Sequence, residues 1–152
     1  MPFRDEESMN ADTVVLKVDE IPRVAVDSMN RTHEEEVELV NRLGSLIRQA
    51  EAGEPDTAAI DQVLEHWITH TEAHFDRENR LMQEYGFPPY PVHAQEHATV
   101  LEEIRGLQSR WLETRELEPL REFVLERWPR WFTMHVNSMD TITAQFLSNF
   151  ID

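Results

Sequence analysis

The 152-residue sequence contains no cysteine, and it has only 14 basic residues against 30 acidic ones. The lack of cysteine excludes disulfides, thiolate metal ligands and cysteine nucleophiles. The formal net charge of −16 argues against nucleic acid or an anionic membrane surface as a partner, because both repel an acidic protein. We therefore expect neither a nucleic-acid partner nor a membrane partner.

Long apolar runs are also missing, since no stretch approaches the roughly 20 apolar residues that cross a bilayer. The N-terminal residues MPFRDEES do not form a signal-peptide pattern, so we expect a cytoplasmic protein. The length is that of one domain of ordinary size, large enough to bury a core.

Helical periodicity dominates the sequence, and no segment alternates like a strand. Helices are predicted over about 26–52, 57–85, 92–114 and 119–150, with Asp56 or Thr57 as a cap and Gly86 as a stop for the second. Pro129 should kink or interrupt the last helix. The sequence thus predicts an all-α, up-down-up-down four-helix bundle over residues 26–152, preceded by an extended N-terminal arm over residues 1–25.

Two motifs in the middle of the chain carry chemistry. His74 and Glu78 lie four residues apart in HFDRENRLM, and His93 and His97 lie four apart in HAQEH. Residues at i and i+4 share one helix face, so each pair can present two ligand atoms to one point. Imidazole and carboxylate together suit iron, manganese or zinc rather than a hard cation with oxygen ligands alone.

Further candidate ligands lie on the first and fourth predicted helices. These are His33 on the first helix, and His135 with Asp140 on the fourth. A spacing of five places two side chains about 140° apart around an ideal helix. Both still reach the interior if the site lies between them or if the helix contains a π-bulge. Five histidines and two carboxylates are enough ligands for two metal ions.

The order of these residues resembles that of the hemerythrin family, which carries a lone histidine, HFxxE, HxxxH and HxxxxD on four successive helices. The corresponding residues here are His33, HFDRE, HAQEH and HVNSMD, and the resemblance runs from about residue 26 to the C-terminus. It implies a centre of two iron ions bridged by oxo or hydroxo, in which the metal ligands are His33, His74, Glu78, His93, His97, His135 and Asp140.

The resemblance also implies how the ligands are shared. His93, His97 and His135 would ligate one iron, while His33 and His74 would ligate the other. The two carboxylates would bridge, and the iron with two histidines would keep an open position for dioxygen.

Two residues depart from the family pattern. Glu36 stands three residues after the first histidine, where hemerythrins usually carry leucine or an aromatic residue, and His70 stands one turn before His74. Glu36 could belong to the solvated run EEEVE, but it shares the apolar helical stripe of His33, which favours an inward position. His66, roughly 12 Å from His74 along the helix axis, is expected at the surface.

Because the first two helices run antiparallel, Glu36 and His70 are displaced in the same direction from the open iron position. We expect them to point into the bundle, to meet near that iron, and to hydrogen-bond to each other or to whatever binds there. Either could instead ligate the metal. A carboxylate and an imidazole beside bound oxygen would suit proton transfer, which makes Glu36 and His70 candidate catalytic residues.

Two functional classes follow from this pattern. The departures favour, by a small margin, a non-haem di-iron oxidoreductase of the oxidase, oxygenase or peroxidase type that acts on O2 or peroxide, with a small polar substrate. The alternative is a reversible O2 carrier, store or sensor without catalysis. Iron storage or delivery is a weaker alternative, since the sequence shows no obvious carboxylate-lined entry. In either main class, O2, another small diatomic or peroxide is the expected partner.

Overall fold

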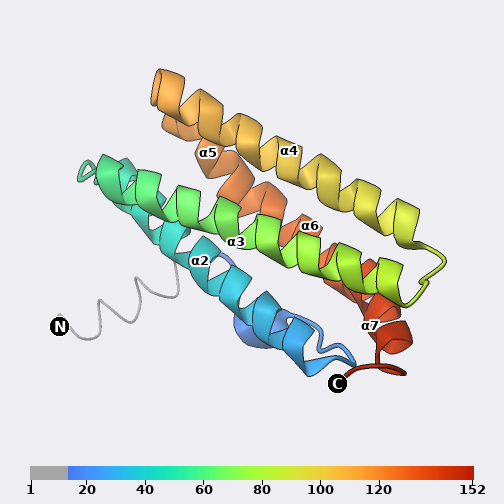
Figure 1. The fold of residues 1–152 in the computed structure, drawn as a ribbon. Helices are drawn as coiled ribbons and strands as arrows, with labels where there is room; N and C mark the ends of the chain where they lie inside the picture. Colours follow the sequence, from blue (N-terminus) through green and yellow to red (C-terminus); the bar gives the residue numbers. More distant parts are fainter. Residues whose placement is uncertain (1–13) are drawn as a thin grey trace.

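The computed structural model describes residues 14–152, and four helical columns account for most of them (Figure 1). A short 3-10 helix, η1 (Val18–Glu20), precedes the first column, α2 (Asp27–Glu51). The second and third columns are α3 (Thr57–Glu84) and α4 (Tyr90–Thr114). No strand occurs within residues 14–152, so the predicted all-α four-helix bundle is confirmed.

The fourth column alternates between α-helix and π-helix. It consists of α5 (Leu117–Glu122), η2 (Phe123–Arg127), α6 (Trp128–His135), η3 (Val136–Asp140) and α7 (Thr141–Leu147). Pro129 does not end the column, because the π-helical segment η2 fills the turn before it, where its missing N–H would have paired. The column ends at Leu147, earlier than the predicted residue 150.

Local chemistry explains most helix ends. The Asp56 side chain accepts a hydrogen bond from the Ala59 N–H and caps α3, as predicted. Gly86 follows α3 with a φ of 68°, a left-handed conformation that glycine adopts at low cost. The helix α4 begins at Tyr90 rather than at 92, because Pro91 fits the first turn of a helix.

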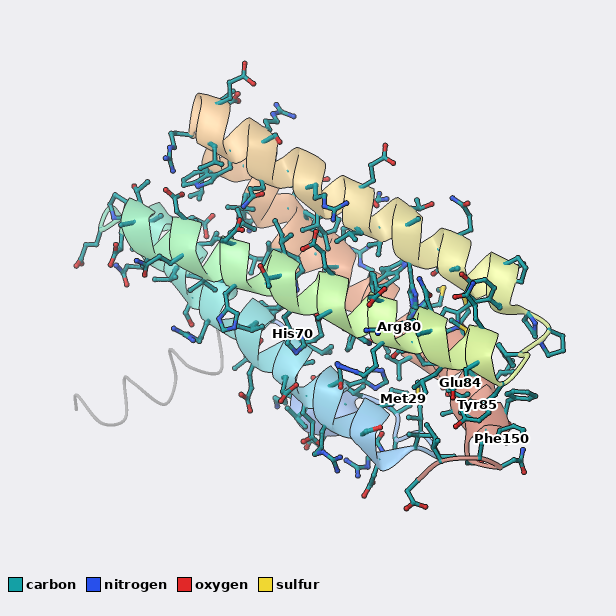
Figure 2. All side chains as sticks on the ribbon, viewed as in Figure 1. Met29, His70, Arg80, Glu84, Tyr85 and Phe150 are labelled. Atoms are coloured by element: carbon teal, nitrogen blue, oxygen red, sulfur yellow. The ribbon has the colours of Figure 1, made fainter. Side chains whose placement is uncertain are left out.

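The core lies along the inward stripes of these columns. On α2 the predicted stripe is fully buried, and its members are Val37, Val40, Leu43 and Ile47. Trp67 of α3 packs edge-on against Trp128 of α6, with ring centroids 5.9 Å apart. At one end of the bundle, Tyr85 stacks on Phe150 at 4.6 Å, and Figure 2 shows the two rings together where α3 and the C-terminal residues end.

Residues 14–26 run along α2 and are held by two asparagines. The Asn41 side chain accepts from the N–H groups of Val15 and Leu16 and donates to the Leu16 carbonyl. Asn30 pairs in the same way with both backbone groups of Val24. The first thirteen residues of the predicted arm lie outside the described residues. Among residues 14–152, no helix is long and apolar enough to cross a membrane.

Candidate metal centre

Seven buried polar side chains meet inside the bundle, and all four columns contribute to them. They are His33 of α2, His74 and Glu78 of α3, His93 and His97 of α4, His135 at the end of α6 and Asp140 at the end of η3. Each is at most 3 % exposed. Burying so many polar and charged groups is costly unless they bind one another or a ligand.

The seven side chains form two groups. His93, His97, His135 and Asp140 each offer one ligand atom, and these four atoms lie within 4.8 Å of one another. A second set of ligand atoms, equally close, comes from His33, His74 and Glu78. The structure therefore brings together every metal ligand that the sequence motifs predicted.

Asp140 and Glu78 each reach both groups. Asp140 Oδ2 lies 3.0 Å from His33 Nε2, and its Oδ1 lies 3.1 Å from His93 Nε2. Glu78 Oε2 lies 2.8 Å from His74 Nε2, and its Oε1 lies 3.3 Å from His97 Nε2. Each carboxylate thus turns one oxygen to each group, which is the geometry of a bridging ligand.

The π-helical segment η3 makes the contribution of the fourth column possible. His135 and Asp140 are five residues apart, and a π-turn pairs i with i+5. In the structure, His135 Nε2 lies 3.2 Å from Asp140 Oδ1, so both point to the same place. The π-bulge alternative raised by the spacing is therefore confirmed.

Several buried atoms of the cluster lack hydrogen-bond partners and are free to bind a metal ion. Among residues 14–152 these atoms include Glu78 Oε1, His97 Nε2 and Asp140 Oδ1, all on the inner side of the cluster. His97 Nδ1 donates to Asn79 Oδ1 at 2.9 Å, which leaves a lone pair on Nε2 in the neutral ring. Lone pairs on imidazoles and carboxylates fit two iron ions well.

Electrostatics in the metal-free protein reflect the same crowding. Burial opposes the charged form of His74, yet the charges of Glu78 and Glu36 and the hydrogen bond to Glu78 outweigh it and raise its pKa to about 10. Burial would also raise the pKa of Asp140, but His135, His33 and His93 hold it well below its usual range. Burial and the charge of Asp140 would raise the pKa of Glu78, but His74 and His97 lower it. Asp140 and Glu78 are thus held ionised, ready to bind cations.

The outer nitrogens of four of the five histidines each face a polar group. Three of these polar groups were not predicted from the sequence. The Nδ1 atom lies 2.8 Å from Thr143 Oγ1 in His93 and 3.3 Å from Glu96 Oε1 in His135. In His97 it contacts Asn79, as described above. Such partners orient ligand rings and adjust their basicity. The only sequence signal for them is their place beside the motif residues.

Trp131, one turn before His135, completes the outer side of that ligand. Its ring stacks on the imidazole with centroids 4.6 Å apart, and its Nε1–H donates to Glu96 Oε1 at 2.9 Å. The same carboxylate oxygen therefore holds both the histidine and the tryptophan that covers it.

The two residues that depart from the family pattern also meet. Glu36 is buried, and His70 Nδ1 donates to its Oε1 at 2.7 Å. Figure 2 shows His70 on the side of α3 that faces α2. Glu36 approaches the outer nitrogen of His74, with Oε1 3.6 Å from Nδ1, whereas Nε2 of that ring faces the other ligands. The catalytic role of Glu36 and His70 stays a prediction. His66 is exposed, as expected.

The fold and the site together define a class: a four-helix bundle with a buried dinuclear site of histidines and bridging carboxylates. A family model described as "Hemerythrin HHE cation binding domain" matches residues 24–147. The chain belongs to the hemerythrin family. This family binds oxygen at a di-iron centre, which confirms the expectation of two iron ions.

Several bacterial relatives extend the match. A bacteriohemerythrin of Aquifex aeolicus (strain VF5) is 28 % identical over 136 residues, which cover 90 % of this chain and 100 % of that protein. A bacteriohemerythrin of Ralstonia nicotianae (strain ATCC BAA-1114 / GMI1000) is 35 % identical over 99 residues, or 65 % of this chain and 69 % of the relative. No solved structure matches the chain significantly.

Proposed function

We propose that this chain binds dioxygen reversibly at a di-iron centre and acts as an oxygen carrier, store or sensor. The observation that carries the proposal is that Glu78 and Asp140 each turn one oxygen to each histidine group. A single metal ion would not need two groups linked in this way. Iron held by these ligands supplies the redox change needed to bind dioxygen.

The two groups are unequal, and the inequality supports a binding position for a small molecule. One group has three histidines, His93, His97 and His135, whereas the other has two, His33 and His74. An iron held by this second group would therefore have one histidine ligand fewer, which would leave room for a small molecule to bind. A diatomic molecule suits this position, because the surrounding side chains are closely packed.

Aromatic side chains pack against the two-histidine group. The Phe132 ring packs edge-on against His33 with centroids 5.6 Å apart, and Phe75 lies 5.1 Å from His74. Both phenylalanines are buried. A dry environment limits proton access to a bound ligand, which favours reversible binding over further reaction.

The position of Glu36 also favours reversible binding. Burial alone would raise its pKa, but the hydrogen bond from His70, the close approach of His74 and the charges of both rings outweigh burial and lower it to about 2. The carboxylate thus holds no proton to give at neutral pH. It also lies on the outer edge of His74 rather than on the Nε2 side.

A second candidate function is oxidative catalysis, with Glu36 and His70 as catalytic residues. The observation in its favour is a row of acid–base groups that begins at the surface. The side chain of Glu35 is 63 % exposed, and its Oε1 lies 3.2 Å from His70 Nε2. His70 in turn contacts Glu36, so this row could deliver the protons that oxidative catalysis on O2 or peroxide consumes.

One experiment separates these functions. The protein is loaded with Fe2+ without air, exposed to air, and followed by absorption spectroscopy for minutes and through repeated removal of oxygen. A spectral change that reverses in each cycle supports the carrier class. Steady consumption of oxygen or peroxide, lost in Glu36→Gln and His70→Gln, supports the enzyme. No response to oxygen by a protein with two irons would refute both.

A further inference from the structure

Glu36 occupies an unusual environment for a glutamate in an acidic surface run. Its neighbours Glu35 and Glu38 are exposed, but its own side chain is only 3 % exposed. Its Oε2 accepts from Trp67 Nε1 at 2.9 Å, and its Oε1 accepts from His70 Nδ1 at 2.7 Å and Thr71 Oγ1 at 3.0 Å. A buried carboxylate with three donors is fixed in one orientation.

All three donors come from α3, the helix that also carries His74. They aim the Glu36 carboxylate at His74 Nδ1, which is 3.6 Å from Oε1 and has no hydrogen-bond partner among residues 14–152. On the opposite edge of the ring, Nε2 faces Glu78 at 2.8 Å. The imidazole is therefore held between a carboxylate inside the metal centre and a carboxylate outside it.

On the other side of the site, a second histidine also has a carboxylate at its outer nitrogen. His135 belongs to the three-histidine group, and its Nδ1 faces the Glu96 carboxylate at 3.3 Å. Each group thus has one histidine backed by a carboxylate, while the outer partners of His93 and His97 are neutral. Outer carboxylates increase the basicity of a ligating imidazole.

We propose that Glu36 is a positioning residue for His74, and that its charge tunes the iron that His74 holds. This inference rests on the proposed di-iron function. The carboxylate keeps Nδ1 protonated and outward, so that Nε2 is the ligating atom. Its negative charge favours the more positive, oxidised iron, because the charges are separated only by the imidazole in a buried setting. His70 and, beyond it, Glu35 anchor this carboxylate from the surface side.

The test measures the midpoint potential of the iron-loaded protein together with its iron content. Glu36→Gln keeps the size of the side chain and one acceptor oxygen but removes the charge. Its midpoint potential should shift upward. Glu38→Gln is the matched control, since it makes the same change at an exposed position on the same helix and should leave the potential unchanged. Loss of one iron from a folded Glu36→Gln, with two retained in Glu38→Gln, would also support the positioning role.

A second variant covers the case in which Glu36→Gln does not fold. Thr71→Val removes the neutral hydrogen bond that Thr71 donates to the Glu36 carboxylate. The negative charge of the carboxylate is then less stabilised by donors and acts more strongly on the iron, so the midpoint potential should shift downward. A wild-type midpoint potential in Glu36→Gln, or in Thr71→Val where Glu36→Gln does not fold, with two irons retained, would overturn the proposal. A wild-type protein that holds no iron would instead refute the proposed function, so the two failures are distinguishable.

Discussion

His33 Nε2 lies 3.0 Å from Asp140 Oδ2, although 107 residues separate the two in the chain. This contact joins the first helical column to the last. It also joins the two-histidine group to the group of His93, His97 and His135, because the other oxygen of Asp140 belongs to that side. The metal centre therefore depends on closure of the whole bundle and on the π-turn that aims Asp140.

Substitution of single ligands should remove iron selectively. His74→Ala takes one of two histidines from its group, so it should lose that iron and retain less than two per chain. His97→Ala should lose iron from the other group. His66→Ala is the matched control on α3, because His66 is exposed, and it should keep both ions. Metal analysis of the purified variants decides the matter, and full occupancy in either ligand variant would contradict the assignment.

Metal binding should release protons and strengthen as pH rises. In the metal-free protein the pKa of His74 is raised to about 10, so its ring is protonated at neutral pH. An ion that binds Nε2 must displace that proton. Affinity should therefore increase from pH 6 to pH 8, by up to about tenfold per pH unit for each proton displaced. Calorimetric titration with Zn2+ in buffers of different ionisation enthalpy measures the released protons, and identical heats would contradict the prediction.

The stability of the metal-free protein at acid pH should depend on Glu36. Its pKa is lowered to about 2 in the folded state, against 4.5 ordinarily. The ionised form therefore contributes stability above pH 4.5, and this contribution, of the order of 3 kcal/mol, is lost as pH falls toward 2. Glu36→Gln should unfold at lower denaturant concentration than wild type at pH 7, with the difference narrowing near pH 3. A difference that is constant with pH would show that charge is not the cause.

The helices and the convergence of the candidate metal ligands were predictable because each depends on short-range spacing. The pairs His74 with Glu78 and His93 with His97 carry their geometry in a four-residue interval, which a helix converts into one face. The apolar stripe that predicted an inward Glu36 worked for the same reason. These features need no knowledge of the neighbouring helix beyond its direction.

The outer partners were not predictable, because they depend on how the helices are rotated and staggered. Thr143 meets His93 across 50 residues of sequence, and Glu96 meets His135 across 39. Glu36 illustrates the difference: its meeting with His70 followed from antiparallel helices, but its approach to Nδ1 rather than Nε2 of His74 depends on the imidazole rotamer. That detail decides whether it faces a bound ligand or supports a metal ligand.

Release of residues 14–26 from α2 should follow from one substitution on that helix. Asn41→Ala removes three hydrogen bonds to the backbone of Val15 and Leu16, leaving partly buried groups to find water instead. The free energy of unfolding should fall by about 1–3 kcal/mol, and residues near Leu16 should become susceptible to protease. Asn137→Ala, at an exposed position, is the matched control and should change neither. Limited proteolysis of the folded proteins tests this, and equal cleavage rates for both variants would mean that apolar packing of Val15, Leu16 and Ile21 holds the segment by itself.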